Sequence, residues 1–469
     1  MNATRTVALM VALCAGGVAP AAELRRGPYL QVMRPDGVTI RWRTDATVRH
    51  TSVVRYGTSP DRLDKCVAAS EPTTHFANCR DWQATVDGLE PDTVYYYALE
   101  ADRAILCGAD ERHRFRTAPR AGAERRLRFW LLGDSGSNRP RADDLKAVLA
   151  ATDVPDPVKV RNGFRKFNSG KPLDGIVLLG DNAYPFGTDE QYQAAFFNVY
   201  KDELVSVPLW PCTGNHDMDT AYKYLFTTNT DGRAGGVPSR NQLYYSADIG
   251  NLHLVVMDPW KEWMEETLDE SHVGWKRQLA WLEKDLASTR RQWLWVVQHF
   301  PQYCDGNYNS DGNEPLVRLR ERLVPLFDTF GVDLALSGHD HSYQRSHLLR
   351  GLTGKSDTLD RAKHFAFDGD GRTSPVTKVP GPNSGTLYVV AGCAGGTRPA
   401  GRFAHPAMVP FEANKGKRGL AVPSSLVIEI EGRTLRGWQV DTRGEVLDAF
   451  TLVHTAARPA PAAPAPRAK

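Results

Sequence analysis

Polar residues of the kinds that bind metals follow five apolar, strand-like segments of the sequence. In chain order they are Asp134, Asp181, Asn215, His299 and the pair His339 and His341. Carboxylate oxygens, amide oxygens and imidazole nitrogens are ligands for divalent and trivalent first-row metals. In open α/β sheets, ligands bind beyond the carboxyl ends of the strands. We therefore expect these residues to meet at one metal site.

Each of these residues, taken alone, has an ordinary structural interpretation. Asp134 alone would be a helix N-cap before RADDLKAVLA, and His299 alone would be a histidine at the edge of the core. The pair His339 and His341 is the strongest single signal, because residues two apart on an extended segment point to the same side. The joint pattern favours a metal site, since packing does not require such residues at every strand end.

Tyr184 adds a phenol to this set, because it is the third residue after Asp181 in GDNAY. The donors are then sufficient for two metal ions that share one bridging ligand. Two metals about 3.5–4 Å apart can clamp the oxygens of a phosphoryl group during in-line displacement. A phenol with a pKa near 10 binds as phenolate only beside a strong positive charge. The structural alternative is an aromatic side chain that packs the loop.

Two kinds of secondary structure must position these residues. Residues 23–118 contain short alternating runs such as GVTIRWRTD, separated by turn signals, and predict an antiparallel β-sandwich. A short linker, 119–123, follows. Residues 124–454 alternate strand-like and helical runs, which predicts an α/β sandwich. Within it, GWKRQLAWLEKDLAS places apolar residues at helical spacing.

The two ends of the sequence differ from the rest in composition. Residues 1–22 contain an apolar run after Arg5 and then small residues, which predicts a cleaved signal peptide and a secreted or periplasmic protein, although a buried helix is the alternative. No later apolar run reaches the length of a membrane span. Residues 455–469 are rich in Ala and Pro and are predicted to be disordered.

The net charge and the cysteine content limit which partners and which cellular compartment the sequence indicates. A net charge of +3 is too small to indicate nucleic acid as a partner. An oxidising compartment would permit disulfides among the cysteines outside the predicted signal peptide, whose pairing the sequence does not determine. These cysteines are Cys66, Cys79, Cys107, Cys212, Cys304 and Cys393.

The motifs GDSG, GDNAY, GNHD, the lone QH and GHDHSYQR occur in this order between Asp134 and Arg345. They resemble the five-motif signature of the purple acid phosphatases, which are calcineurin-like metallophosphoesterases. GTLYVVAGCAGG resembles a further segment of that family. The N-terminal β-module resembles the fibronectin-III-like domain of plant-type members. The resemblance implies a catalytic domain with two mixed sheets flanked by helices.

The same resemblance implies roles for the individual ligands. Fe(III) would be held by Asp134, Asp181, Tyr184 and His341. Asp181 would bridge to a second, divalent metal (Zn, Fe or Mn), completed by Asn215, His299 and His339. Family members of this kind hydrolyse phosphomonoesters at acidic pH by attack of a metal-bound hydroxide, so a small phosphorylated substrate is implied.

His216 is the candidate that contacts phosphate and helps to protonate the leaving oxygen. Its alternative is a structural histidine behind the ligands. Asp217 could orient it, as carboxylates often orient imidazoles. Asp340, Tyr343 and Arg345 are interpreted as support for the site.

The sequence departs from the plant-type pattern on the leaving-group side. Plant-type members have extra histidines nine or ten residues after the lone metal histidine, where this chain has Tyr308 and Asn309. Tyr303, Tyr308 and His272 are candidate substitutes that the sequence does not rank.

Two other functions stay open at this point. One is a phosphodiesterase or nucleotide hydrolase of the same superfamily, which the relative rates on a monoester and a diester would distinguish. The other is an exported binding protein with a degenerate site, which the intact ligand set argues against. The sequence does not determine the physiological substrate or the oligomeric state.

Overall fold

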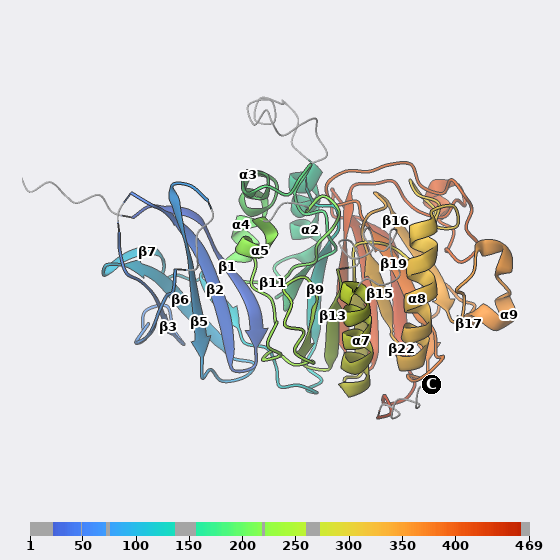
Figure 1. Ribbon diagram of the computed structural model, residues 1–469, viewed down its shortest axis with the longest axis horizontal. Helices are drawn as coiled ribbons and strands as arrows, with labels where there is room; N and C mark the ends of the chain where they lie inside the picture. Colours follow the sequence, from blue (N-terminus) through green and yellow to red (C-terminus); the bar gives the residue numbers. More distant parts are fainter. Residues whose placement is uncertain are drawn as a thin grey trace, which may run out of the picture.

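The computed structural model describes residues 22–47, 49–71, 76–136, 156–217, 221–258 and 273–460. Residues 1–21 of the predicted signal peptide and residues 461–469 of the predicted tail lie outside the described residues. Figure 1 shows an all-β part (blue) beside a larger α/β part (green to red). Among the described residues, no helix is long and apolar enough to cross a membrane.

The N-terminal part is a β-sandwich, as the sequence predicts. One face is formed by β1, β2 and β5, and the other by β3, β4, β6 and β7, with β8 paired to β6. Apolar side chains of both faces, such as Trp42 and Tyr97, share one core. The strands are β1 (Leu24–Arg34), β2 (Gly37–Asp45), β3 (Ser52–Gly57), β4 (Lys65–Ala68), β5 (Cys79–Asp87), β6 (Val94–Ala101), β7 (Ala104–Gly108) and β8 (Arg114–Arg116).

The sandwich is joined to the α/β part through a shared sheet. The ten-stranded sheet has the order β18-β22-β21-β20-β9-β10-β11-β1-β2-β5. Strand β1 pairs in parallel with β11, with Leu30 opposite Pro208. The strands added here are β9 (Leu127–Leu132), β10 (Gly175–Leu178), β11 (Pro208–Trp210), β18 (Val376–Lys378), β20 (Ser424–Glu431), β21 (Thr434–Asp441) and β22 (Val446–His454).

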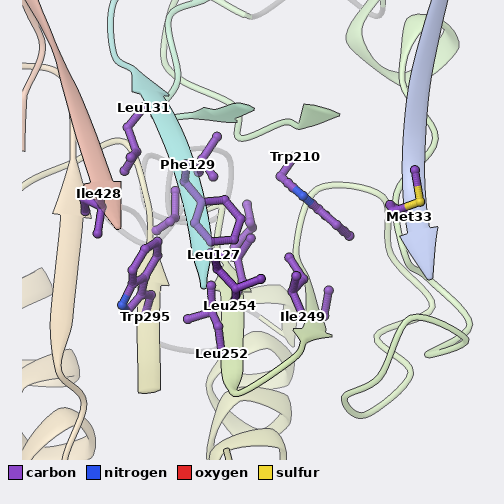
Figure 2. Close-up of a cluster of buried hydrophobic side chains, with 14 of the residues drawn as sticks. Met33, Leu127, Phe129, Leu131, Trp210, Ile249, Leu252, Leu254, Trp295 and Ile428 are labelled. Atoms are coloured by element: carbon purple, nitrogen blue, oxygen red, sulfur yellow. The ribbon is translucent and has the colours of Figure 1, made fainter. Parts of the chain in front are cut away.

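The second sheet of the α/β part has the order β12-β13-β14-β15-β19-β16-β17 and mixes parallel and antiparallel pairs. Its strands are β12 (Tyr245–Ile249), β13 (Leu252–Val256), β14 (Trp293–Val297), β15 (Leu334–Ser337), β16 (Tyr343–Leu349), β17 (Phe365–Phe367) and β19 (Thr386–Ala391). The central core lies between the two sheets. In Figure 2, Phe129 of β9 and Trp295 of β14 lie close together, and their ring centroids are 5.4 Å apart.

Helices cover the outer faces of the two sheets. On the first sheet, Phe164 of α2 stacks on Trp130 of β9, with ring centroids 3.9 Å apart. On the second, the predicted amphipathic helix is α7, and its Leu282 and Leu286 are buried. Helix α8 is capped by the Asn313 side chain. The helices are α2 (Asp156–Asn168), α3 (Asp189–Tyr192), η1 (Gln193–Phe197), α4 (Asn198–Leu204), α5 (Ala221–Leu225), α7 (Val273–Ser288), α8 (Glu314–Phe330), η2 (Ser356–Thr358), α9 (Arg361–His364) and η3 (Glu412–Asn414).

The start of the predicted disordered tail is held on the α/β part. Arg458 donates to Asp333 Oδ2 at 2.5 Å and to the carbonyl oxygens of Phe330 and Gly331. A buried carboxylate therefore binds the Arg458 guanidinium, and disorder over residues 455–469 stays a prediction. The six described cysteines that could have formed disulfides are all unpaired thiols.

Candidate metal centre

The carboxyl ends of strands from both sheets meet at one place. Asp134 follows β9, Asp181 follows β10 and Asn215 follows β11, all in the first sheet, whereas His299 follows β14 and His339 follows β15 in the second. Asp134, Asp181 and His299 each offer one ligand atom within 4.8 Å of the others. The structure thus brings together residues that lie up to about two hundred positions apart in the sequence, as the strand-end pattern predicts.

Tyr184 lies inside this cluster and is not an isolated packing residue. Its hydroxyl is 3.0 Å from Asp134 Oδ1, 3.0 Å from Asp181 Oδ2 and 3.2 Å from His341 Nε2. His341 Nε2 is also 3.2 Å from Asp134 Oδ1. The four side chains expected to hold one metal therefore converge with their donor atoms inward.

The other ligand candidates form an adjoining group around Asn215. His299 Nε2 and His339 Nδ1 each lie 3.1 Å from Asn215 Oδ1, and His299 Nε2 is 3.3 Å from Asp181 Oδ2. The Leu179 carbonyl oxygen is 2.8 Å from His299 Nδ1. Because a carbonyl only accepts, Nδ1 carries a proton, and Nε2 is the ring atom that faces the oxygens of Asp181 and Asn215. Asp181 belongs to both groups, which is the position expected for a bridging ligand.

Close packing of the main chain makes this convergence dependent on glycine. A Cβ on Gly214 would lie 2.3 Å from Asp181 Oδ1, and one on Gly338 would lie 2.4 Å from Asp134 Oδ2. Asp134, Asp181 and His339 adopt left-handed backbone angles, with φ of 54°, 54° and 67°. Such conformations are unfavourable for residues other than glycine and cluster at functional sites.

The site concentrates negative charge away from water. Asp134 is 0% exposed and Asp181 is 1% exposed, and the only ion pairs they make among the described residues are with histidines. Burial lowers the pKa of His299, but Asp181 outweighs it and raises that pKa to about 9. Burial and the charges of Asp134 and Asp181 raise the pKa of Tyr184 well above its ordinary value. In the protein alone, these two buried acids thus depend on histidine for positive charge.

His216 lies at the rim of the same cluster. Its main-chain NH donates to Asp181 Oδ1 at 2.7 Å, and its ring centroid is 4.3 Å from that of Tyr184. Its Nδ1 is 2.8 Å from the Pro185 carbonyl oxygen, so Nδ1 is the protonated nitrogen. Nε2 is left for another partner.

Asp217 does not orient His216, contrary to the expectation from the sequence. Its carboxylate instead accepts from the Asn182 main chain at 3.1 Å, the Gly214 main chain at 2.9 Å and the Tyr192 hydroxyl at 2.6 Å. The Asn182 side chain adds a further bond at 2.9 Å. Asp217 therefore fastens the loops after β10 and β11 to each other. Sequence reasoning missed this role, because Tyr192 lies on α3 and nothing local marks it as a partner.

The residues interpreted as support lie behind the ligands. Tyr343 and Arg345 both donate to Asp448, and the Asp340 carboxylate accepts from Ser342 and from the Tyr308 main chain. These bonds fix the segment that follows the histidine pair.

Of the candidate substitutes for the extra histidines, only Tyr308 is placed beside the ligands. Its ring stacks on His339, with centroids 4.2 Å apart and planes at 14°. Tyr303 is buried and donates to the Leu352 carbonyl, which turns its hydroxyl into the core. His272 lies outside the described residues.

Known proteins resemble both parts of the chain. Residues 26–117 match the purple acid phosphatase N-terminal domain, and residues 127–343 match the calcineurin-like phosphoesterases. Acid phosphatase type 7 of Homo sapiens is 26% identical over 377 residues, which cover 77% of this chain and 75% of that protein. Purple acid phosphatase 18 of Arabidopsis thaliana is 25% identical over 349 residues, covering 71% of this chain and 68% of the relative.

A solved structure shares the fold. It is that of a purple acid phosphatase from yellow lupin (Lupinus luteus) seeds, with a TM-score of 0.67 at 18% identity, and the match covers 92% of this chain and 74% of that one. The arrangement of a β-sandwich and a two-sheet α/β part is therefore the arrangement of that protein.

Proposed function

The chain belongs to the purple acid phosphatase family, with its N-terminal domain and its calcineurin-like phosphoesterase domain, and on that premise we propose that it is an exported, dinuclear-metal hydrolase of phosphomonoesters. Membership in a metallophosphoesterase family implies two metals and a phosphorylated substrate. The choice of monoesters, the acidic working range and export are the parts that we propose.

The observation that carries the proposal is a set of metal-binding side-chain atoms that face one another in a buried site. His299 Nε2 lies 3.3 Å from Asp181 Oδ2 and 3.1 Å from Asn215 Oδ1. Among the described residues, the buried carboxylates of Asp134 and Asp181 form ion pairs only with histidines. Metal cations would satisfy all of these atoms at once, so the residues fit the group that the family implies.

We assign the ligands as the resemblance implies. Asp134, Asp181, Tyr184 and His341 would hold Fe(III), and Asp181, Asn215, His299 and His339 would hold a divalent Zn, Fe or Mn. Fe(III) is the proposal for the first position because a phenolate needs a strong positive charge beside it. The metal pair, when bound, supplies the nucleophile for hydrolysis and positive charge to neutralise the phosphate.

Side chains around the proposed metal pair would bind and orient the reacting groups. The Pro185 carbonyl holds His216 Nδ1, so Nε2 is the atom at which a proton can be held for the leaving oxygen. The side chain of His216 is partly exposed at the rim, where a substrate could reach it. Asp217 bonds the loops on either side, which supports the position of His216 beside the candidate ligands.

The test is hydrolysis of p-nitrophenyl phosphate and of bis(p-nitrophenyl) phosphate at acidic pH, with the metal content measured on the same sample. We expect the monoester to be hydrolysed faster. His216→Asn should lower kcat by about 10²-fold or more while leaving the metal content unchanged. The matched control is His364→Asn on α9, where the His364 side chain accepts from the Asp360 main chain at 2.9 Å.

Each other outcome points to a different function. Faster hydrolysis of the diester would make the protein a phosphodiesterase. A protein that binds its metals but hydrolyses neither ester would be a binding protein. Equal activity of His216→Asn and the wild type would remove His216 from the chemistry.

A further inference from the structure

Arg398 lies next to the proposed metal ligands, and its positive charge is not paired with a described residue. Its main-chain NH donates to the carbonyl oxygen of His341 at 2.9 Å, so its Cα is fixed beside that ligand. The side chain is exposed, whereas His341 is 6% exposed and Asp134 0%. Its guanidinium makes no ion pair with a described residue. It is therefore an exposed cation on the segment whose main chain bonds a proposed ligand.

The loop that contains Arg398 is braced by a buried carboxylate. Asp305 Oδ1 accepts from the Phe403 main chain at 2.5 Å and Oδ2 from the His405 main chain at 3.0 Å. The Asp305 carbonyl oxygen accepts from the main chain of Gly401 at 2.6 Å. Asp305 is 0% exposed. The segment after β19 and the segment after β14 are thus joined into one wall.

Tyr308 belongs to the same wall, three residues after Asp305. It is the residue that stacks on His339, at 4.2 Å. Tyr308 and Arg398 together border the site on the side of His339 and His341.

We propose that Arg398 binds a second anionic group of the substrate, a carboxylate or a second phosphate, beyond the phosphoryl group that is hydrolysed. The inference rests on the proposed function and adds the substrate class to it. The scissile phosphoryl group belongs at the buried ligands, and the exposed Arg398 lies outward of them. A guanidinium binds carboxylate or phosphate through paired N–H bonds. The braced loop lowers the entropy cost of holding it there.

The test uses two substrates that differ in one anionic group. 3-Phosphoglycerate has a carboxylate where glycerol 3-phosphate has a neutral hydroxymethyl group. We expect the wild type to have the higher kcat/KM on 3-phosphoglycerate. Arg398→Gln should reduce the ratio of the two kcat/KM values about tenfold. Arg398→Lys, which keeps the charge but loses the paired N–H groups, should give a ratio between those of the wild type and Arg398→Gln.

Arg402→Gln is the matched control. Arg402 is an exposed arginine of the same loop, but its guanidinium already lies over the Phe403 ring, 5.6 Å from the centroid. This variant removes the same charge and should leave the ratio at the wild-type value. A ratio that falls equally in both variants would overturn the proposal, since the cause would then be the overall charge of the loop.

Other outcomes separate this inference from the proposed function. If Arg398→Gln lowers both rates by the same factor, Arg398 binds the scissile phosphate and the proposal is wrong. If the wild type hydrolyses both substrates with equal kcat/KM, the protein is a phosphatase without this preference. Hydrolysis of neither substrate, with p-nitrophenyl phosphate also intact, would instead contradict the proposed function.

Discussion

The hydroxyl of Tyr184 lies 3.0 Å from Oδ1 of Asp134, although the two residues are fifty positions apart. Tyr184 follows β10 and Asp134 follows β9, and these strands pair in parallel. The contact therefore depends on the pairing of the strands and on the loop after β10. Two carboxylates buried beside one phenol are costly unless a cation joins the group.

Replacing Tyr184 tests whether that cation is ferric iron. We expect the protein as isolated to show a phenolate-to-iron charge-transfer band in the visible spectrum. Tyr184→Phe should abolish the band, because the variant keeps the ring and removes the ligand atom. Tyr303→Phe is the control, since Tyr303 is a buried tyrosine that bonds a main-chain carbonyl. A colourless wild type that binds metal would mean that the site holds divalent ions only.

Asp217 should be needed for stability and for retention of the metals. Asp217→Asn replaces an acceptor oxygen by an NH₂ group that faces the donors of Asn182, Gly214 and Tyr192. We expect a loss of about 2 kcal/mol in the free energy of unfolding and a lower metal content. Urea unfolding and metal analysis measure these two effects.

The control for Asp217 is an exposed aspartate with a main-chain partner. Asp231 accepts from the Arg233 main chain at 3.1 Å, and Asp231→Asn should change the free energy of unfolding by less than about 0.5 kcal/mol. An Asp217→Asn protein as stable as the wild type would contradict the bracing role.

His253 should make stability depend on pH in the alkaline range. Its two ring nitrogens lie 2.8 Å from Asp248 Oδ1 and 2.8 Å from Asp285 Oδ2. Burial lowers its pKa, but the charge of Asp285 and its other contacts raise it to about 9, above about 6.5 in the unfolded chain. The stabilisation is therefore complete below pH ~6.5 and is lost as the pH rises through about 9.

The measurement for His253 is the difference in unfolding free energy between the wild type and His253→Gln. We expect the difference to be largest at pH ~6 and to shrink by a few kcal/mol at pH ~10. Taking the difference at each pH cancels effects of the metals common to both proteins. A difference that stays constant across this range would mean that His253 is neutral in the folded protein.

Arg458 should stabilise the α/β part from outside its last strand. It bonds Asp333, which also pairs with Lys378 at 2.7 Å and with His454 at 2.9 Å. Because those two partners remain, we expect Arg458→Ala to cost about 1–3 kcal/mol and not to unfold the protein. Thermal unfolding measures it. Arg433→Ala, at an exposed position next to β21, should have no effect beyond about 0.5 kcal/mol.

The convergence of three candidate ligands could be predicted, because Asp134, Asp181 and His299 each come soon after an apolar run. The rule that strand ends meet then assembles Asp134, Asp181 and His299 without knowledge of their contacts. The role of Asp217 could not be predicted, since its partners Asn182 and Tyr192 come from different loops and helices. Arg398 also gave no signal in the sequence. Its position depends on a main-chain bond to His341.

The class of the fold could be predicted from the sequence, but the contacts between the β-sandwich and the α/β part could not. The alternation in GVTIRWRTD indicated one polar face on β2, with Arg41 and Arg43 in it. In the structure both arginines are buried, and Arg43 bonds Asp81 and, across the junction, Asp189. Alternation reports which side chains share a face, and it does not report that a second layer covers the polar face.

The parallel pairing of β1 with β11 has a consequence for how the chain is made. During synthesis, β2 and then β5 emerge soon after β1, so these strands can pair on one side of it early. The other side of β1 has to wait until Pro208 and Leu209 have left the ribosome. Until then an apolar strand has an open edge, which is the kind of surface that recruits other chains. We therefore expect this edge of the first strand to stay unpaired while more than a third of the sequence, between Arg34 and Leu209, is being translated.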